Sequence, residues 1–105
     1  MRTLHHFGIP TTAKQPDETY IAGGKLFVTN ADASPNKIEW LRFEAGSPMP
    51  ELLKGCAHIA YRVDDLKAEM KGKKVLLEPF SPMAGVTVAF IVEEGAPIEL
   101  MLIEG

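Results

Sequence analysis

The sequence predicts a small α+β protein in which strands dominate and the chain consists of two similar halves. Three observations support this fold class: many short segments rich in β-branched, aromatic and aliphatic residues, one clear helix, and an internal repeat. The 105 residues are enough for one hydrophobic core but too few for two independent ones. We therefore expect a single domain over residues 1–105.

Seven segments are predicted as strands, because Gly, Pro, Asn or Asp bound them and their residues favour extended structure. In chain order they are residues 3–9, 20–30, 37–44, 57–63, 73–80, 86–94 and 97–104. Residues 11–20 have Pro16 in the middle and almost no apolar pattern, which predicts a loop. Residues 31–36 are expected to form a turn between strands.

One helix is predicted over residues 64–72. Asp64 is a natural N-cap, two apolar residues four apart share a face, and Gly72 is placed to end the helix. A shorter turn of helix is expected at residues 48–55.

Charge and cysteine content argue against several classes of protein. Charged residues make up 24% of the chain and the net charge of −3 is scattered, so no nucleic-acid partner is expected. The single cysteine, Cys56, has no disulfide partner in the chain and is interpreted as an apolar filler. No segment has the composition of a membrane span or a signal peptide. We expect a cytoplasmic protein without a membrane partner.

The two halves of the chain align at two places. The matched segments are HFGI with HIAY, and KIEWLRFEAG with PIELMLIEG. His6 therefore corresponds to His58, and Glu39 to Glu99. The spacing from His to Glu is longer in the second half by about the length of the predicted helix, so the first half resembles the second with its helix removed.

Two imidazoles and two carboxylates are what a divalent first-row metal requires, provided that the halves pack about a pseudo-twofold axis. Taken singly, a strand glutamate is more often exposed, and a lone histidine is more often hydrogen-bonded in a core or at a surface. Matched recurrence in two halves favours a metal site made of His6, Glu39, His58 and Glu99. His5 leaves an alternative open, because a one-residue shift in register would present it instead of His6.

The quoted segments resemble the vicinal oxygen chelate superfamily, which includes glyoxalase I, methylmalonyl-CoA epimerase, extradiol dioxygenases, and fosfomycin- and bleomycin-resistance proteins. The resemblance rests on HHFGIP, HIAYRVDDL, GVTVAFIVEEGAPIEL and the repeat. It is strong over residues 56–105 and weaker over 4–9 and 37–44. It is absent from 11–19, where the family has its first helix.

The resemblance implies paired βαβββ modules that form a cup-shaped, eight-stranded mixed sheet, with the helix of the first module short or missing. Module one would cover about residues 1–46 and module two residues 56–105, joined by a linker over 47–55. Family ligands come from the first and last strand of each module. This carries the metal-binding role to His6, Glu39, His58 and Glu99.

The full ligand set is similar to that of glyoxalase I and, with one conservative difference, to that of the epimerase. It implies a metal-dependent isomerase or lyase that acts on a small oxygenated substrate through an enolate-like intermediate, with Zn, Ni, Co, Mn or Fe as Lewis acid. Either Glu39 or Glu99 would be the catalytic base. A non-enzymatic small-molecule-binding module of the bleomycin-resistance kind is the alternative. Extradiol dioxygenases typically use two His and one Glu, so a fourth ligand argues against an iron oxygenase.

Strand parity also predicts substrate contacts. Arg62 shares a face with His58 and would hold a substrate carboxylate or phosphate, although an exposed or salt-bridged strand arginine is the commoner situation. Leu41, Phe43 and Met101 would form the apolar wall of the pocket, although such residues are more often core. Without the first helix, one wall of the cup would be thin or supplied by a second subunit, and a homodimer is the default expectation.

Overall fold

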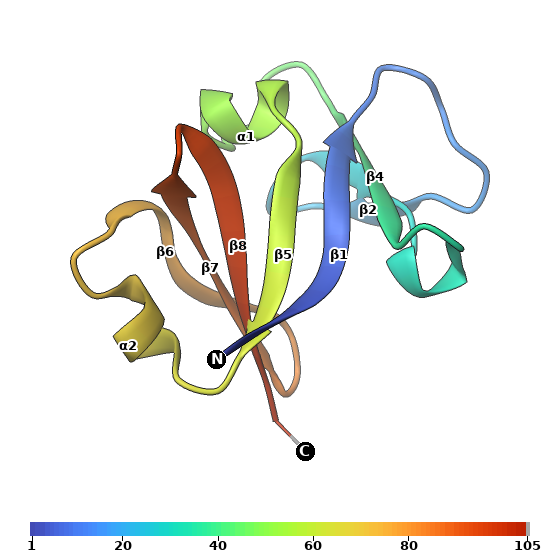
Figure 1. The fold of residues 1–105 in the computed structure, drawn as a ribbon. Coiled ribbons are helices and arrows are strands. Elements are labelled where there is room, and N and C mark those ends of the chain that lie inside the picture. The colour runs from blue at the N-terminus through green and yellow to red at the C-terminus, as the bar shows by residue number, and fades with distance from the viewer. Residues whose placement is uncertain (105) are drawn as a thin grey trace.

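A computed structural model describes residues 1–104 as a curled sheet of eight strands with two short α-helices (Figure 1). The elements are β1 (Arg2–Pro10), β2 (Thr19–Ile21), β3 (Leu26–Val28), η1 (Ala31–Ala33), β4 (Ile38–Phe43), α1 (Glu51–Gly55), β5 (His58–Val63), α2 (Leu66–Met70), β6 (Lys74–Met83), β7 (Val86–Glu93) and β8 (Ala96–Ile103). The predicted α+β class, with a cup-shaped mixed sheet and few helices, is confirmed. Residue 105, the predicted end of the second module, lies outside the described residues.

The sheet consists of two four-stranded halves that meet at β1 and β5. Its strand order is β2-β3-β4-β1-β5-β8-β7-β6. β1 pairs with β4 in parallel, β5 pairs with β8 in parallel, and β1 and β5 are antiparallel. The second half runs strand, helix, three strands, whereas the first half has a loop over residues 11–18 where the helix would be.

The pairing register gives the two halves a pseudo-twofold relation. In each half, the glutamate of the last strand lies opposite the residue two positions after the histidine of the first strand. Glu39 lies opposite Gly8, and Glu99 lies opposite Ala60. The sequence repeat is therefore a repeat of strand register as well as of residue type.

The prediction of one strand over residues 20–30 is wrong, because this segment is the hairpin of β2 and β3. Two successive glycines, Gly23 and Gly24, lie in the turn, and Lys25 follows with φ of 50°. A left-handed backbone of this kind is typical of tight turns and interrupts a continuous strand.

The helix predicted over residues 64–72 forms but is shorter than expected. Its N-cap is Asp65 and not Asp64: the Asp65 carboxylate accepts a hydrogen bond from the backbone N–H of Ala68 at 3.0 Å. Gly72 follows the helix with φ of 74°, a conformation that glycine adopts without strain.

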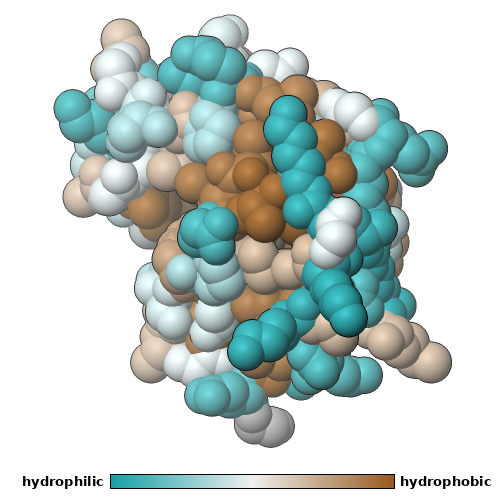
Figure 2. All heavy atoms as spheres, turned by 90° about the vertical axis from the view of Figure 1, so that its left-hand side faces the viewer, coloured by the Kyte–Doolittle hydropathy of each residue, from teal (hydrophilic) through white to brown (hydrophobic). Residues whose placement is uncertain are grey.

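One face of the sheet packs against α2. The buried cluster on this face consists of Val63, Leu66, Ala89, Ile91, Ile98 and Leu100. Figure 2 views the molecule from the left-hand side of Figure 1, where α2 lies, and shows hydrophobic side chains gathered centrally with hydrophilic ones around them. Glu99 lies between two residues of this cluster in β8, so its side chain points to the opposite face, which we call the ligand face. Within residues 1–104, no helix is long and apolar enough to cross a bilayer.

Candidate metal centre

The four predicted ligands lie on four adjacent strands at the middle of the sheet. His6 is on β1, Glu39 on β4, His58 on β5 and Glu99 on β8, and these strands are neighbours in the order β4-β1-β5-β8. Residues opposite one another on paired strands share a face, so the register directs all four side chains to the ligand face.

The ligand atoms of these residues lie close together. His6, Glu39 and His58 each offer one ligand atom, and the three atoms lie within 4.8 Å of one another. Nε2 of His6 is 3.5 Å from Oε1 of Glu39 and 3.4 Å from Oε1 of Glu99. Nε2 of His58 is 3.0 Å from the same oxygen of Glu99. The structure thus brings the four residues together, with Glu99 beside the group of three.

Nε2 of His6 is buried and has no hydrogen-bond partner among the described residues. Its two carboxylate neighbours are charge contacts at distances too long for good hydrogen bonds. Coordination of a cation would give this nitrogen a direct partner. Imidazole nitrogen and carboxylate oxygen are ligands that suit a first-row divalent ion, so the residues present fit such a metal.

The charges of the site are coupled. Burial lowers the pKa of His6, but the carboxylates of Glu39 and Glu99 outweigh this effect and raise the pKa to about 9. Burial raises the pKa of Glu99, whereas contacts with His58 and His6 lower it more strongly, to about 2. In the metal-free protein a protonated imidazole therefore balances the carboxylates, and metal binding would release that proton.

Gly8 makes room for His58, a role that the sequence analysis missed. A Cβ at residue 8 would lie 2.0 Å from Cε1 and 2.4 Å from Nε2 of His58, so the imidazole lies directly against the glycine. In the other half, Ala60 lies opposite both His6 and Glu99 and is fully buried. The alignment of Gly8 with Ala60 in the repeat, two small residues at matched positions, was the available signal.

His5 does not take the place of His6 at the site. The pairing of β1 with β5 shifts between Leu4 and His6, so His5 is an additional residue in the strand. Its Nδ1 lies 2.8 Å from Nδ1 of His6, and the two ring centroids are 5.1 Å apart. Nε2 of His6 faces the two glutamates, and His5 contacts the Nδ1 side of the same ring.

The predicted substrate residues are more dispersed. Arg62 is exposed, and its Nη2 donates a hydrogen bond to the carbonyl of Ile103 at 3.3 Å. Leu41 is 4% exposed and belongs to the core. Met101 is half-buried and lies opposite Arg62 on the neighbouring strand.

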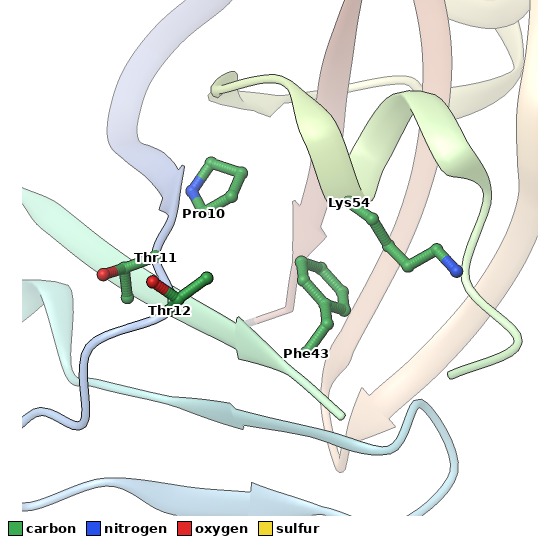
Figure 3. A pocket seen from close by; sticks show the side chains of 5 residues that line it. All are labelled: Pro10, Thr11, Thr12, Phe43 and Lys54. Atoms are coloured by element: carbon green, nitrogen blue, oxygen red, sulfur yellow. The ribbon is translucent and has the colours of Figure 1, made fainter. Parts of the chain in front are cut away.

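Phe43 lines a cavity of about 500 Å³ together with Pro10, Thr11, Thr12 and Lys54 (Figure 3). Figure 3 shows the Lys54 ammonium pointing away from the two threonines. Phe43 is four residues beyond Glu39, or about 13 Å along the strand, and the four ligand residues are not part of the lining. A second cavity, of about 350 Å³, is lined in part by His5, Asp32 and Lys37 and so adjoins the histidine pair.

Comparison with known proteins gives a fold but no function. No family model matches the chain, and no curated protein matches it. Among solved structures, the chain is similar to a hypothetical protein from Bacillus halodurans C-125, with 19% identity and a TM-score of 0.72 over 99% of this chain and 96% of that chain. At this identity the likeness shows the fold alone. The curled mixed sheet is compatible with the vicinal oxygen chelate architecture.

Proposed function

We propose that the protein is a metal-dependent isomerase or lyase of the vicinal oxygen chelate superfamily, of the glyoxalase or epimerase kind. The observation that carries the proposal is the convergence of His6, Glu39 and His58 within 4.8 Å, with Glu99 in contact with both histidines. The substrate would be a small oxygenated compound, the class that the resemblance to glyoxalase I and the epimerase implies.

The two glutamates differ in a way that assigns them separate roles. The Glu99 side chain is 10% exposed, accepts a hydrogen bond from His58, and has a pKa of about 2. So weak a base suits a permanent ligand. The Glu39 side chain is 25% exposed, and its Oε1 lies 3.5 Å from Nε2 of His6. A more accessible and loosely held carboxylate is better suited to take a proton from a substrate carbon.

The bound ion would supply Lewis-acid polarisation of a substrate oxygen. The protein would supply the rest: His58 and Glu99 form a fixed, buried pair, and Glu39 removes the proton from the carbon beside the polarised carbonyl. The apolar core on both sides of the sheet would keep the ligand residues in place, as preorganised groups need.

Glu39→Gln and Glu99→Gln test this assignment as a matched pair. The measurement is exchange of solvent deuterium into the carbon beside the carbonyl of small 2-hydroxycarbonyl and 2-oxo compounds, with Zn, Ni, Co or Mn added. Glu39→Gln should keep its metal and lose exchange by about 100-fold or more, because a general base contributes at least that factor. Glu99→Gln should lose the metal itself. A Glu39→Gln protein that exchanges at the wild-type rate would contradict the role of Glu39.

A non-enzymatic binding module is the second candidate function. The cavity of about 500 Å³ favours it, because that cavity lies away from the ligand residues and has an apolar side in Pro10 and Phe43. This function predicts that a small aromatic carboxylate binds equally well to wild type and to His58→Ala in a calorimetric titration. Metal binding without deuterium exchange on any probe would also favour this function over the enzyme.

A further inference from the structure

His5 and His6 form a pair of rings that a regular strand would separate. Successive residues of a strand point to opposite faces, but the register shift between Leu4 and His6 inserts His5 as an additional residue. The two rings meet edge to face at an interplanar angle of 77°, with their Nδ1 atoms 2.8 Å apart. The irregularity therefore creates a side-chain hydrogen bond immediately behind the candidate metal centre.

We propose that His5 is a positioning residue that accepts a hydrogen bond from Nδ1–H of His6 and so leaves Nε2 of His6 free to bind a metal ion. This inference rests on the proposed metal-dependent function. It assigns to His5 a role that differs from that of the four ligands.

The number of protons on the imidazole decides whether Nε2 of His6 can bind a metal ion. The form of His6 that binds a metal is the neutral one, and a neutral histidine ring carries one proton, so one of its nitrogens donates and the other accepts. At an Nδ1 to Nδ1 distance of 2.8 Å, one of the two rings must be the donor. If His6 donates, its Nε2 has the lone pair and faces the oxygens of Glu39 and Glu99. If His6 accepts, its Nε2 carries the proton and cannot coordinate a metal.

The repeat shows that this contact is specific to the first half. The residue before His58, which corresponds to His5, is Ala57 and has no side-chain acceptor. Nδ1 of His58 makes no hydrogen bond within residues 1–104. His58 is instead held by its contact with Glu99 and by its packing against Gly8. The two halves thus orient equivalent ligands by different means.

Two substitutions separate the acceptor from the bulk of the His5 side chain. His5→Asn keeps an acceptor oxygen close to the place of Nδ1, and His5→Leu keeps a side chain of similar size without an acceptor. The measurements are the Zn²⁺ dissociation constant, by competition with a chromophoric chelator, and the ¹⁵N chemical shifts of the His6 ring in the Zn-loaded protein. We expect His5→Leu to weaken Zn²⁺ binding by about 10–100-fold, the usual effect of losing the partner of a ligating histidine, and His5→Asn to bind within about threefold of wild type.

In wild-type protein loaded with Zn²⁺, the ¹⁵N shifts should place the His6 proton on Nδ1. A proton on Nε2, unchanged affinity in His5→Leu, or equal losses in both variants would overturn the positioning role. If His5→Leu fails to fold, the ¹⁵N shifts of the wild-type protein still decide the tautomer. A wild-type protein that binds no Zn²⁺ or other divalent ion would overturn the proposed function as well. A protein that binds Zn²⁺ with the His6 proton on Nε2 would overturn the positioning role of His5 alone.

Discussion

Gly8 and His58 share one small volume, and this contact can be tested at the level of a single residue. In Gly8→Ala the new Cβ would lie 2.0 Å from Cε1 of His58, so the imidazole must leave its present position. We expect a loss of about 1–3 kcal/mol in the free energy of unfolding, as for other overpacked sites. Metal affinity should fall by about 10-fold or more, because ligands must be held within about 0.5 Å of the productive geometry.

Gly23→Ala is the matched control for this prediction, since a Cβ at residue 23 meets no atom within 4 Å. Urea denaturation and Zn²⁺ titration of both variants provide the comparison. Equal metal affinity of Gly8→Ala and wild type would show that His58 does not depend on the space above Gly8.

For single residues, the residue types and their recurrence in the two halves predicted the candidate ligands. The spacing of residues in the sequence could not predict which side chains contact those ligands. Glu99 was noticeable in sequence because it interrupts an apolar strand where a lone carboxylate is costly. The roles of Gly8 and His5 depend on which ring fills which space and on a local register shift, and neither has a signature in the residue pattern. Strand parity predicted that Arg62 shares a face with His58. It could not predict that the Arg62 side chain donates a hydrogen bond to the backbone carbonyl of Ile103.

Among the elements, a network of ion pairs connects β1, β7, α2 and the segment after α2. The Arg2 guanidinium donates to Glu93 at 2.7 and 2.9 Å and to Glu69 of α2 at 2.7 Å, and Lys73 lies 2.7 Å from Glu93. The hydrogen bonds from Arg2 and then Lys73 lower the pKa of Glu93 from 4.5 to about 2. The network fixes the start of the strand that carries both His5 and His6.

This network predicts a pH dependence of stability. Because the folded-state pKa of Glu93 is below its unfolded value, its stabilisation is fully present above pH 4.5 and is lost as the pH falls toward 2. We expect wild type to be more stable than Glu93→Gln by about 1 kcal/mol at pH 7, a value discounted for solvent screening of a partly exposed pair. Denaturation curves at several pH values check this. A stability difference that does not shrink between pH 4.5 and 2 would contradict the prediction.

The secondary structure could be predicted where the composition and the length of a segment both indicated the same element. It was harder to predict where a turn lies inside a segment of strand-forming residues. The segment from Tyr20 to Asn30 consists largely of strand formers, and only Gly23 and Gly24 mark its hairpin. The helix of the first half was expected to be short or missing, and no helix forms over residues 11–18, which lack an apolar stripe. The helix cap was misplaced by one residue, since Asp64 and Asp65 are equally good caps in sequence and only the backbone geometry selects between them.

For the whole molecule, the missing first helix leaves apolar side chains uncovered. Leu4 and Phe7 on β1 are 39% and 36% exposed, and Phe7 points away from the ligand face. We propose that a second copy of the chain covers them in a homodimer. Light scattering of wild type should give the mass of a dimer, and Phe7→Glu should shift the equilibrium to the monomer. A wild-type protein that is monomeric at micromolar concentration would refute this.

Four neighbouring strands of one curled sheet bring two histidines and two glutamates together, and we propose that these residues hold a divalent metal ion. Elemental analysis of protein purified without chelators or an affinity tag tests this claim most directly. We expect about one first-row divalent ion per chain, and much less in His58→Ala. We also expect Tm to rise when Zn, Ni, Co or Mn is added to the metal-depleted wild type. A wild-type protein that contains no metal, and whose Tm does not change with any of these ions, would contradict it.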